Sequence, residues 1–253
     1  MSEPLLFQTL LYLWFALAAI VFVALFFITA PYGRHAADSR LPKINATFGW
    51  VFMESPSVLV FAACFLLSNR PITAPLIAFL ALWELHYVNR SWIFPFMRRG
   101  GVKSMPIPVA LGAFFFTSVN GYLNGRYLNQ FAPVYPTAWL WDPRFLIGAT
   151  LFFSGFFINQ QSDRILFNLR KPGETGYKIP RGGLYRFVSC PNYLGEIIEW
   201  SGFALATWSP AGLAFVAWTI ANLAPRAWSH HRWYLGKFAD YPRERRALVP
   251  LLF

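Results

Sequence analysis

The fold is decided by residues 154–200, which read SGFFINQQSDRILFNLRKPGETGYKIPRGGLYRFVSCPNYLGEIIEW. Two apolar segments enclose a polar run from Arg164 to Ser189. Asn159 and Asp163 are four residues apart and Arg170 follows seven later, so one continuing helix would place all three on one face. We call such a row a polar stripe. Acidic and amide side chains within a segment apolar enough to span a membrane require a polar partner, which makes this stripe a candidate functional site.

Two more polar stripes follow the same spacing. One consists of Asn192, Glu196 and Glu199, and the other of Arg226, His230 and Tyr234 at i, i+4 and i+8. Taken alone, the basic stripe reads as a solvated face near anionic lipid headgroups. Together the three stripes supply Arg and His for phosphates, Asn and Asp for amide or ribose groups, and Tyr for stacking, which is what a dinucleotide requires.

The motif that would place such a nucleotide on a Rossmann fold is missing from the sequence. No Gly-x-Gly-x-x-Gly follows a predicted strand, so a nucleotide would be held between helices and by the loop 164–189. The two cysteines, Cys64 and Cys190, lie far apart without metal-ligand spacing, and we predict no metal site.

The composition is that of an integral membrane protein. Of the 253 residues 56% are hydrophobic, 19% are aromatic and only 13% are charged, whereas a soluble domain carries roughly 25% charged residues; the mean hydropathy is +0.40. The first apolar run, Leu5 to Ala30, is too long for a signal-peptide core and lacks a basic segment before it, so we expect a retained span. The net charge of +11 comes from basic residues between apolar segments, which indicates membrane orientation rather than nucleic-acid binding.

We read seven apolar segments as membrane spans, although several are shorter than the roughly 20 residues that an apolar core of about 30 Å requires. They are Leu5 to Ala30, Phe48 to Leu67, Ile72 to Phe96, Met105 to Leu123, Phe145 to Asn159, Tyr193 to Trp208 and Ala211 to Leu223. If successive segments cross the membrane in alternating directions, all but three of the 22 Lys and Arg residues fall on one side of the membrane. The exceptions are Arg70, Arg126 and Arg144. The positive-inside rule then places the N-terminus outside and the C-terminus in the cytoplasm. We therefore predict one all-α, seven-helix transmembrane domain over residues 1–253, with residues 145–253 carrying most of the cofactor site.

Two polar residues in the early spans are candidates for catalysis. An unpaired carboxylate in hydrocarbon takes up a proton, so Glu54 is expected to be neutral. The neutral acid is either a hydrogen-bonded residue of the core or a donor to a substrate carbonyl. A protonated Glu54 and the hydroxyl of Tyr87 converging on one oxygen would form an oxyanion hole for an enolate. Glu84 shares a face with Tyr87, three residues on, whereas His86 points away from both and is expected to be structural.

At this point the residues resemble a known family, the steroid 5α-reductases. The segments that carry the resemblance are Asn159-Gln160-Gln161-Ser162-Asp163, Leu169-Arg170-Lys171-Pro172-Gly173-Glu174, Tyr177-Lys178-Ile179-Pro180, Gly182-Gly183-Leu184, Asn192-Tyr193-Leu194-Gly195-Glu196-Ile197-Ile198-Glu199-Trp200, His230-His231-Arg232-Trp233-Tyr234, Gly49-Trp50 with Glu54, and His86-Tyr87 with Arg90. They cover nearly the whole chain after the first span. The Asn-Tyr-Leu-Gly-Glu element is less specific by itself, since sterol C14 and C7 reductases and isoprenylcysteine methyltransferases carry related patterns.

The resemblance implies a reductase that uses NADPH to saturate the C4=C5 bond of a 3-oxo-Δ4-steroid by hydride transfer to C5. Glu54 and Tyr87 would hydrogen-bond the C3 carbonyl. The residues implied in cofactor binding are Arg90, Asn159, Asp163, Arg170, Tyr177, Asn192, Glu196, Trp200, Arg226, His230 and Tyr234. Its partners would be an apolar steroid or sterol-like substrate and membrane lipid. A bacterial source is expected, which places the protein in the inner membrane; a eukaryotic one would place it in the endoplasmic reticulum, with the cofactor side cytoplasmic in either case.

The sequence departs from the family pattern at two places. Where the family typically has a glutamine before the catalytic glutamate, this chain has Met53, which cannot donate a hydrogen bond, so substrate preference or rate is expected to differ. A basic residue expected after Arg98-Arg99 is displaced, with Gly101 near that place and Lys103 as a stand-in.

Three alternatives stay open on the residues alone. One is an NADPH-dependent reductase of another sterol or lipid enone. The second is a membrane methyltransferase that uses S-adenosylmethionine, which would not need Tyr87 and Glu54 to converge. The third is a non-catalytic membrane scaffold or transporter, which leaves three acid, amide and basic stripes beside a long basic loop without a role.

Overall fold

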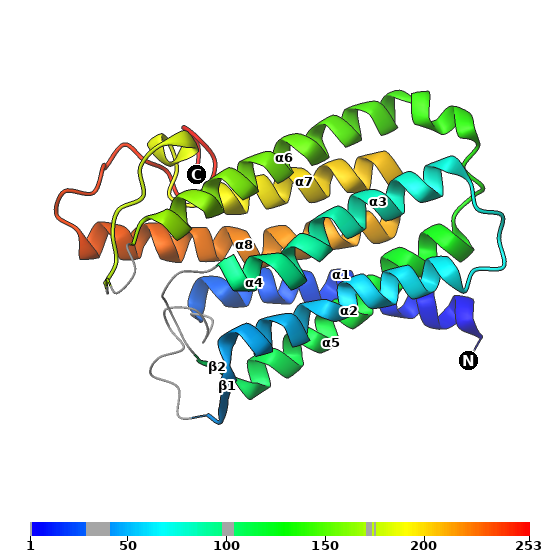
Figure 1. Ribbon diagram of the computed structural model, residues 1–253, viewed down its shortest axis with the longest axis horizontal. Coiled ribbons are helices and arrows are strands. Elements are labelled where there is room, and N and C mark those ends of the chain that lie inside the picture. Colours follow the sequence, from blue (N-terminus) through cyan, green and yellow to red (C-terminus); the bar gives the residue numbers. More distant parts are fainter. Residues whose placement is uncertain (1, 29–40, 98–103, 171–173, 175) are drawn as a thin grey trace.

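The structure, a computed structural model, describes residues 2–28, 41–97, 104–170, 174 and 176–253. Its framework is a bundle of long helices (Figure 1). Those of 15 or more residues are α1 (Glu3–Phe27), α2 (Ala46–Leu66), α3 (Ala74–Val88), α5 (Ile107–Arg126), α6 (Pro143–Asn168), α7 (Pro191–Thr207) and α8 (Pro210–Lys237). Gly101 and Lys103, and Lys171 to Gly173 of one segment that carries the resemblance, lie outside the described residues.

Shorter elements extend or connect these helices. The π-helix η2 (Asn89–Ile93) and helix α4 (Phe94–Met97) continue α3, and the π-helix η3 (Tyr127–Phe131) continues α5. Two 3₁₀ turns, η4 (Thr137–Trp141) and η5 (Gly183–Arg186), precede α6 and α7, respectively. Strands β1 (Lys43–Asn45) and β2 (Ser104–Pro106) pair antiparallel and form the one sheet among the described residues, so the expected absence of a Rossmann fold holds there and the all-α prediction needs this small correction.

The helix starts follow from local sequence. Six of the seven long helices carry a proline in their first turn, where its fixed φ suits the helix and its missing N–H is not needed. The exception is α2, whose N-cap Asn45 accepts hydrogen bonds from the backbone N–H groups of Thr47 (2.9 Å) and Phe48 (3.1 Å). The strand β1 therefore passes directly into a capped helix.

The apolar segments locate all seven long helices but not all of their limits. The segment Phe145 to Asn159 is only the first part of α6, and Ala211 to Leu223 only the first part of α8, because main-chain hydrogen bonding continues through polar residues. Met105 was expected in a helix and instead pairs with Ile44 in the sheet.

Two of the three predicted polar stripes are confirmed as single helical faces, and one is only partly confirmed. Asn159 and Asp163 lie on α6, but that helix ends at Asn168, so the prediction that Arg170 continues the stripe is wrong. The other two stripes lie wholly within α7 and α8, as their spacing predicts.

Among the described residues, α1 and α2 are the helices that are both long and apolar enough to cross a membrane by composition. The other long helices carry more polar side chains. Seven spans and their orientation therefore stay predictions, although the segments expected on the cytoplasmic side do gather at one end of the bundle, at the left in Figure 1.

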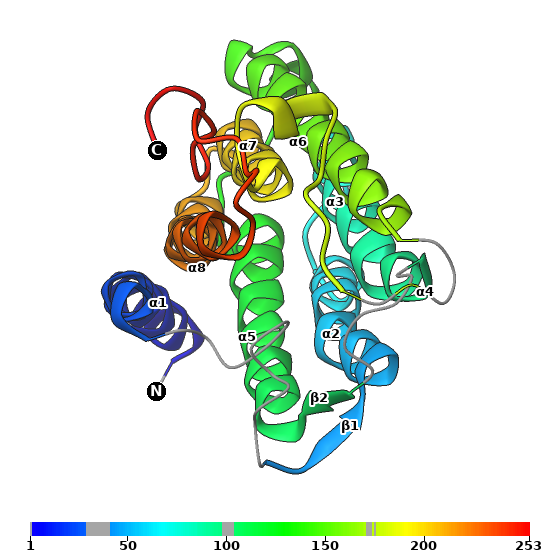
Figure 2. The ribbon, with the colours of Figure 1, turned by 90° about the vertical axis from the view of Figure 1, so that its left-hand side faces the viewer.

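The bundle is ordered by a few extensive contacts. Helix α7 packs between α6 and α8, α1 lies along α8, and α5 lies along α2 (Figure 2). The α6–α7 contact is made through backbone, because a Cβ added at Gly155 would collide with the backbone nitrogen of Glu199, and one at Gly195 would lie 2.6 Å from that of Asn159. Small residues permit such close approach. The glycines thereby bring the stripes of α6 and α7 together.

Candidate active site

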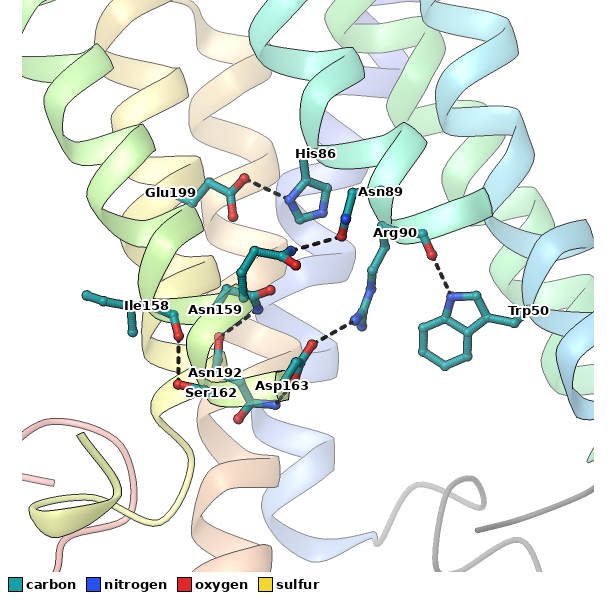
Figure 3. Close-up of polar contacts among 11 residues, drawn as sticks. Trp50, His86, Asn89, Arg90, Ile158, Asn159, Ser162, Asp163, Asn192 and Glu199 are labelled. Atoms are coloured by element: carbon teal, nitrogen blue, oxygen red, sulfur yellow. Dashed lines mark hydrogen bonds and ion pairs between the residues drawn. The ribbon is translucent and has the colours of Figure 1, made fainter. Parts of the chain in front are cut away.

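The most constrained cation of the site is Arg90, on the π-helical turn η2. Its guanidinium lies between two aromatic faces, 4.8 Å from the ring centre of Trp50 and 4.4 Å from that of Phe94. The indole N–H of Trp50 also donates to the backbone carbonyl of Arg90 (3.0 Å), as Figure 3 shows. A π-helical turn inside a longer helix often marks a functional site, and here it carries the arginine. The stacking fixes the direction in which the positive charge points.

That charge meets acids from three other helices. The NH1 atom of Arg90 lies 3.8 Å from Oδ2 of Asp163 on α6 (Figure 3). Glu196 on α7 and Glu54 on α2 also lie within electrostatic range of the same guanidinium. Arg90 thus lies close to the predicted catalytic acid and to two predicted cofactor residues.

An amide network joins α6 to α7 beside this cation. The side-chain amide of Asn192 donates to Oδ1 of Asp163 (3.2 Å), and that of Asn159 donates to the backbone carbonyl of Asn192 (3.0 Å) (Figure 3). Gln160 extends the network to η2, the continuation of α3, by donating to Oδ1 of Asn89 (2.9 Å). The first two polar stripes therefore meet, as helical spacing indicated, while the Gln160–Asn89 bond joins two residues that the sequence analysis did not select.

A second buried pair crosses from α3 to α7. Nδ1 of His86 lies 2.8 Å from Oε1 of Glu199, and both residues are almost fully buried (Figure 3). The His86 and Tyr87 rings stand edge to face at 4.9 Å, so His86 lies beside the catalytic candidate while bonding to another helix. The structural role expected for His86 thereby gains a specific partner.

The two catalytic candidates, Glu54 on α2 and Tyr87 on α3, lie close enough to interact electrostatically. Tyr87 is 4% exposed, and Glu54 lies within electrostatic range of its hydroxyl. The register between the helices is set one turn away, where the indole N–H of Trp83 donates to the backbone carbonyl of Ser57 (2.8 Å). Glu84, also on α3, has no hydrogen-bond partner for either carboxylate oxygen among the described residues and does not join the site.

The predicted cofactor residues of α8 contact α7. Arg226 lies over the ring of Tyr193 at 5.2 Å, and the Tyr193 hydroxyl lies 3.2 Å from Nε2 of His230. Tyr234 stacks on Tyr241 of the C-terminal tail at 5.1 Å. The sequence analysis did not name Tyr193 as a cofactor-binding candidate, although it follows Asn192. Its contacts, Arg226 and His230, lie more than thirty residues downstream, where spacing within one helix does not reach.

The two remaining polar candidates lie together at the edge of the loop between α6 and α7. The guanidinium of Arg170 lies 5.6 Å from the ring centre of Tyr177, and Tyr177 stands edge to face on Trp233 of α8 at 4.8 Å. Both side chains thus reach the region of the α8 stripe from outside the helices, which is where a loop that helps to hold a ligand should place them.

Trp200 lies deeper than the other cofactor candidates. It is 1% exposed and packs between His86 (4.6 Å), Tyr87 (5.4 Å) and Phe215 (4.4 Å). The structure therefore places it in the main apolar core, beside the catalytic candidate Tyr87.

Several buried polar atoms in this region have no partner within the described chain. They are Oε2 of Glu199, Nε1 of Trp200 and the hydroxyl of Tyr185. Tyr185 lies in electrostatic range of Asp163 and Tyr234, and burial raises the pKa of its phenol well above the ordinary value, so the hydroxyl keeps its proton. Buried polar groups normally have partners. Of these atoms, the Tyr185 hydroxyl, near Asp163 and Tyr234, is the donor that a polar ligand at the cofactor stripes could use.

Comparison with known proteins shows the family of this chain. The model of the family described as 3-oxo-5-alpha-steroid 4-dehydrogenase matches residues 103–253. The chain belongs to this family. It is 46% identical to 3-oxo-5-alpha-steroid 4-dehydrogenase 1 of Bos taurus, over 100% of this chain and 99% of that protein, and 45% identical to the protein of the same name from Homo sapiens, over 100% and 97%.

The 3-oxo-5-alpha-steroid 4-dehydrogenase family extends to plants among these relatives. Steroid 5-alpha-reductase DET2 of Solanum lycopersicum is 43% identical over 100% of this chain and 99% of that protein. The resemblance seen in the sequence is thereby confirmed. Membership implies a steroid substrate, a nicotinamide cofactor and an oxidoreductase activity.

Proposed function

We propose that this protein is an NADPH-dependent membrane reductase that converts 3-oxo-Δ4-steroids to 5α-3-oxosteroids. The observation that carries the proposal is the position of Arg90, which lies 3.8 Å from Asp163 and within electrostatic range of Glu54 and Glu196. One cation thus borders a carbonyl-binding pair and an amide and acid network. This is the arrangement expected where a polar cofactor meets the reacting end of an apolar substrate.

The carbonyl side consists of Glu54 and Tyr87. In the reaction a hydride adds to C5, the C4=C5 electron pair moves toward the carbonyl, and negative charge develops on the C3 oxygen. The hydroxyl of Tyr87 and the protonated carboxyl of Glu54 donate hydrogen bonds to that oxygen. A proton then adds at C4, so that the substrate gains two hydrogens. Donors aimed at developing charge in a dry site contribute more to rate than they would in water.

The cofactor side consists of the residues named for it from the sequence: Arg90, Asn159, Asp163, Arg170, Tyr177, Asn192, Glu196, Trp200, Arg226, His230 and Tyr234. Bound NADPH would supply the hydride. The amides of the α6 and α7 stripes suit an amide or ribose, and the arginines suit phosphate oxygens because the guanidinium donates in a fork. The density of basic residues at this end of the bundle supports NADPH over NADH.

The membrane arrangement is part of the proposal. All seven long helices would span, with the N-terminus outside and the cofactor end in the cytoplasm, as one domain over residues 1–253. Large apolar side chains on outward faces support this, among them Tyr12 (73% exposed), Phe115 (65%) and Phe157 (65%). Large apolar side chains exposed on several helices suit contact with lipid.

One assay tests the reaction, the cofactor and the substrate class together. Purified protein in lipid or detergent receives NADPH and testosterone or progesterone, and mass spectrometry resolves the products with their configuration at C5. A gain of two hydrogens with 5α geometry, dependent on NADPH, is the expected result. Cofactor binding without product would overturn the proposed substrate and leave a reductase of another enone, with Met53 the first residue to replace. No NADPH binding would refute a reductase altogether.

A further inference from the structure

The surroundings of the Tyr87 hydroxyl contain two polar residues that the proposed reaction has not used. Ser57 on α2 and Asn120 on α5 lie within reach of this hydroxyl, although neither completes a hydrogen bond of normal geometry with it. Both residues are fully buried, at 0% exposure. Buried polar side chains are normally paired, so their presence at this point of the core needs a reason.

The packing of α5 on α2 fixes where Asn120 faces. One turn before it, the Thr117 hydroxyl donates to the backbone carbonyl of Met53 (2.6 Å). Directly after it, a Cβ added at Gly121 would lie 3.4 Å from the backbone carbonyl oxygen of Pro56. Asn120 lies between these two contacts and is therefore held against the Pro56 turn of α2, next to Ser57.

The amide of Asn120 has a defined orientation. Asn124, one turn later on α5, donates to the backbone carbonyl of Asn120 (3.1 Å) and to its Oδ1 (3.3 Å). The side-chain oxygen of Asn120 is thereby used as an acceptor along α5. Its Nδ2 has no hydrogen-bond partner among the described residues. The free donor is the part of the amide that is available to Tyr87.

The neighbouring position on α2 offers no such donor. Met53 is 8% exposed and packs in an apolar cluster with Ala46, Met105 and Ala110. Its side chain cannot donate a hydrogen bond. Among these residues of α2 and α5, the amide that reaches toward the carbonyl-binding pair therefore comes from α5.

We propose that Asn120 is a positioning residue for the proposed reduction, and that its Nδ2 donates to the phenol oxygen of Tyr87. This inference rests on the proposed function. A phenol oxygen has one proton and two lone pairs. A donor that occupies a lone pair leaves the proton to point at the steroid carbonyl, and it strengthens that bond as charge develops on the substrate oxygen.

The test begins with the wild-type protein and then uses Asn120→Ala and Asn120→Leu, the second of which removes the donor while nearly keeping the volume. We expect kcat to fall roughly three- to tenfold in both, as the loss of one hydrogen bond would give, with NADPH affinity and the KM for steroid unchanged. In a Tyr87→Phe background, adding Asn120→Ala should cause no further loss, because the residue acts through the hydroxyl.

Asn129→Ala is the matched control. Asn129 is another buried asparagine, in the η3 extension of α5, and its side chain donates only to the Gly125 carbonyl of its own helix (2.8 Å), so its loss should leave kcat unchanged.

Full activity of both Asn120 variants, or an equal loss from Asn120→Ala with and without the Tyr87 hydroxyl, would overturn the positioning role alone. A wild-type protein that reduces no 3-oxo-Δ4-steroid would instead overturn the proposed function and this inference with it. If Asn120→Ala does not fold, Asn120→Leu carries the comparison.

Discussion

Nδ1 of His86 and Oε1 of Glu199 lie 2.8 Å apart in the core, joining α3 to α7 behind the catalytic candidate Tyr87. Removing one member of a buried, hydrogen-bonded pair leaves the other without a partner, which typically destabilises a protein by about 3–5 kcal/mol. Glu199→Ala should therefore lower the thermal denaturation midpoint strongly. Replacing both residues by leucine should recover part of the loss, because no polar group is then left unpaired. Equal midpoints for Glu199→Ala and the wild type would contradict this.

The carbonyl-binding pair predicts a specific kinetic defect. Tyr87→Phe and Glu54→Ala should each lower kcat about 10²- to 10³-fold, the effect typical of losing an oxyanion-hole donor. NADPH affinity should change little, since only the carbonyl side is altered. Tyr12→Phe, at a lipid-facing position on α1, is the matched control and should retain full activity. Wild-type turnover in either site variant would remove that residue from the mechanism.

The cofactor side predicts the opposite pattern. Arg170→Ala and Asn192→Ala should weaken NADPH binding first, by about 10- to 100-fold if each donates to a charged group. Isothermal titration of NADPH into the purified variants measures this directly. Arg144→Ala is the control, because Arg144 pairs with Asp142 at the far end of α6. Unchanged affinity in both site variants would show that these residues do not hold the nucleotide.

The glycine contact between α6 and α7 predicts a structural defect. Gly155→Ala would push a methyl group into the backbone of α7 at Glu199. Both stability and NADPH binding should fall, because the α6 and α7 stripes would move apart. Gly112→Ala is the control, since nothing lies within 4 Å of its added Cβ, and in a helix interior it should stabilise by roughly 0.5–1 kcal/mol. A Gly155→Ala protein with normal melting would disprove the tight contact.

The pH dependence predicted for the start of α6 concerns Asp142. Hydrogen bonds from the Arg144 side chain and backbone lower the pKa of this N-cap carboxylate from 3.8 to about 2. Because the folded-state pKa is depressed, its stabilisation is complete above pH 4 and is lost as the pH falls towards 2. Melting curves of wild type and Asp142→Asn should therefore differ at neutral pH and converge in acid. A constant difference down to pH 2 would contradict this.

Helical periodicity predicted the part of the site that depends on spacing within one helix. Asn159 and Asp163 share a face of α6, and their meeting with Asn192 follows from two apolar helices joined by one loop. The same reasoning wrongly extended the helix to Arg170, because hydropathy does not indicate where a helix ends within a polar sequence.

Contacts between distant segments could not be predicted in the same way. The partners His86 and Glu199 are 113 residues apart, and Gln160 reaches back 71 residues to Asn89. No spacing rule links such positions, so His86 could be assigned a structural role but not a partner. The closeness of α6 and α7 likewise depends on glycines from two separate segments facing one another.

The contact between α6 and α7 also limits how the molecule can move. Helices separated by side chains can slide past each other by small rotamer changes, which is the shear motion of many domains. Gly155 and Gly195 leave no side chain between these backbones to absorb such sliding. The two helices are therefore expected to move as one rigid body. Any opening that admits a ligand would then occur at another interface of the bundle, such as that of η2 with α6, where the side chains of Asn89 and Gln160 make the contact.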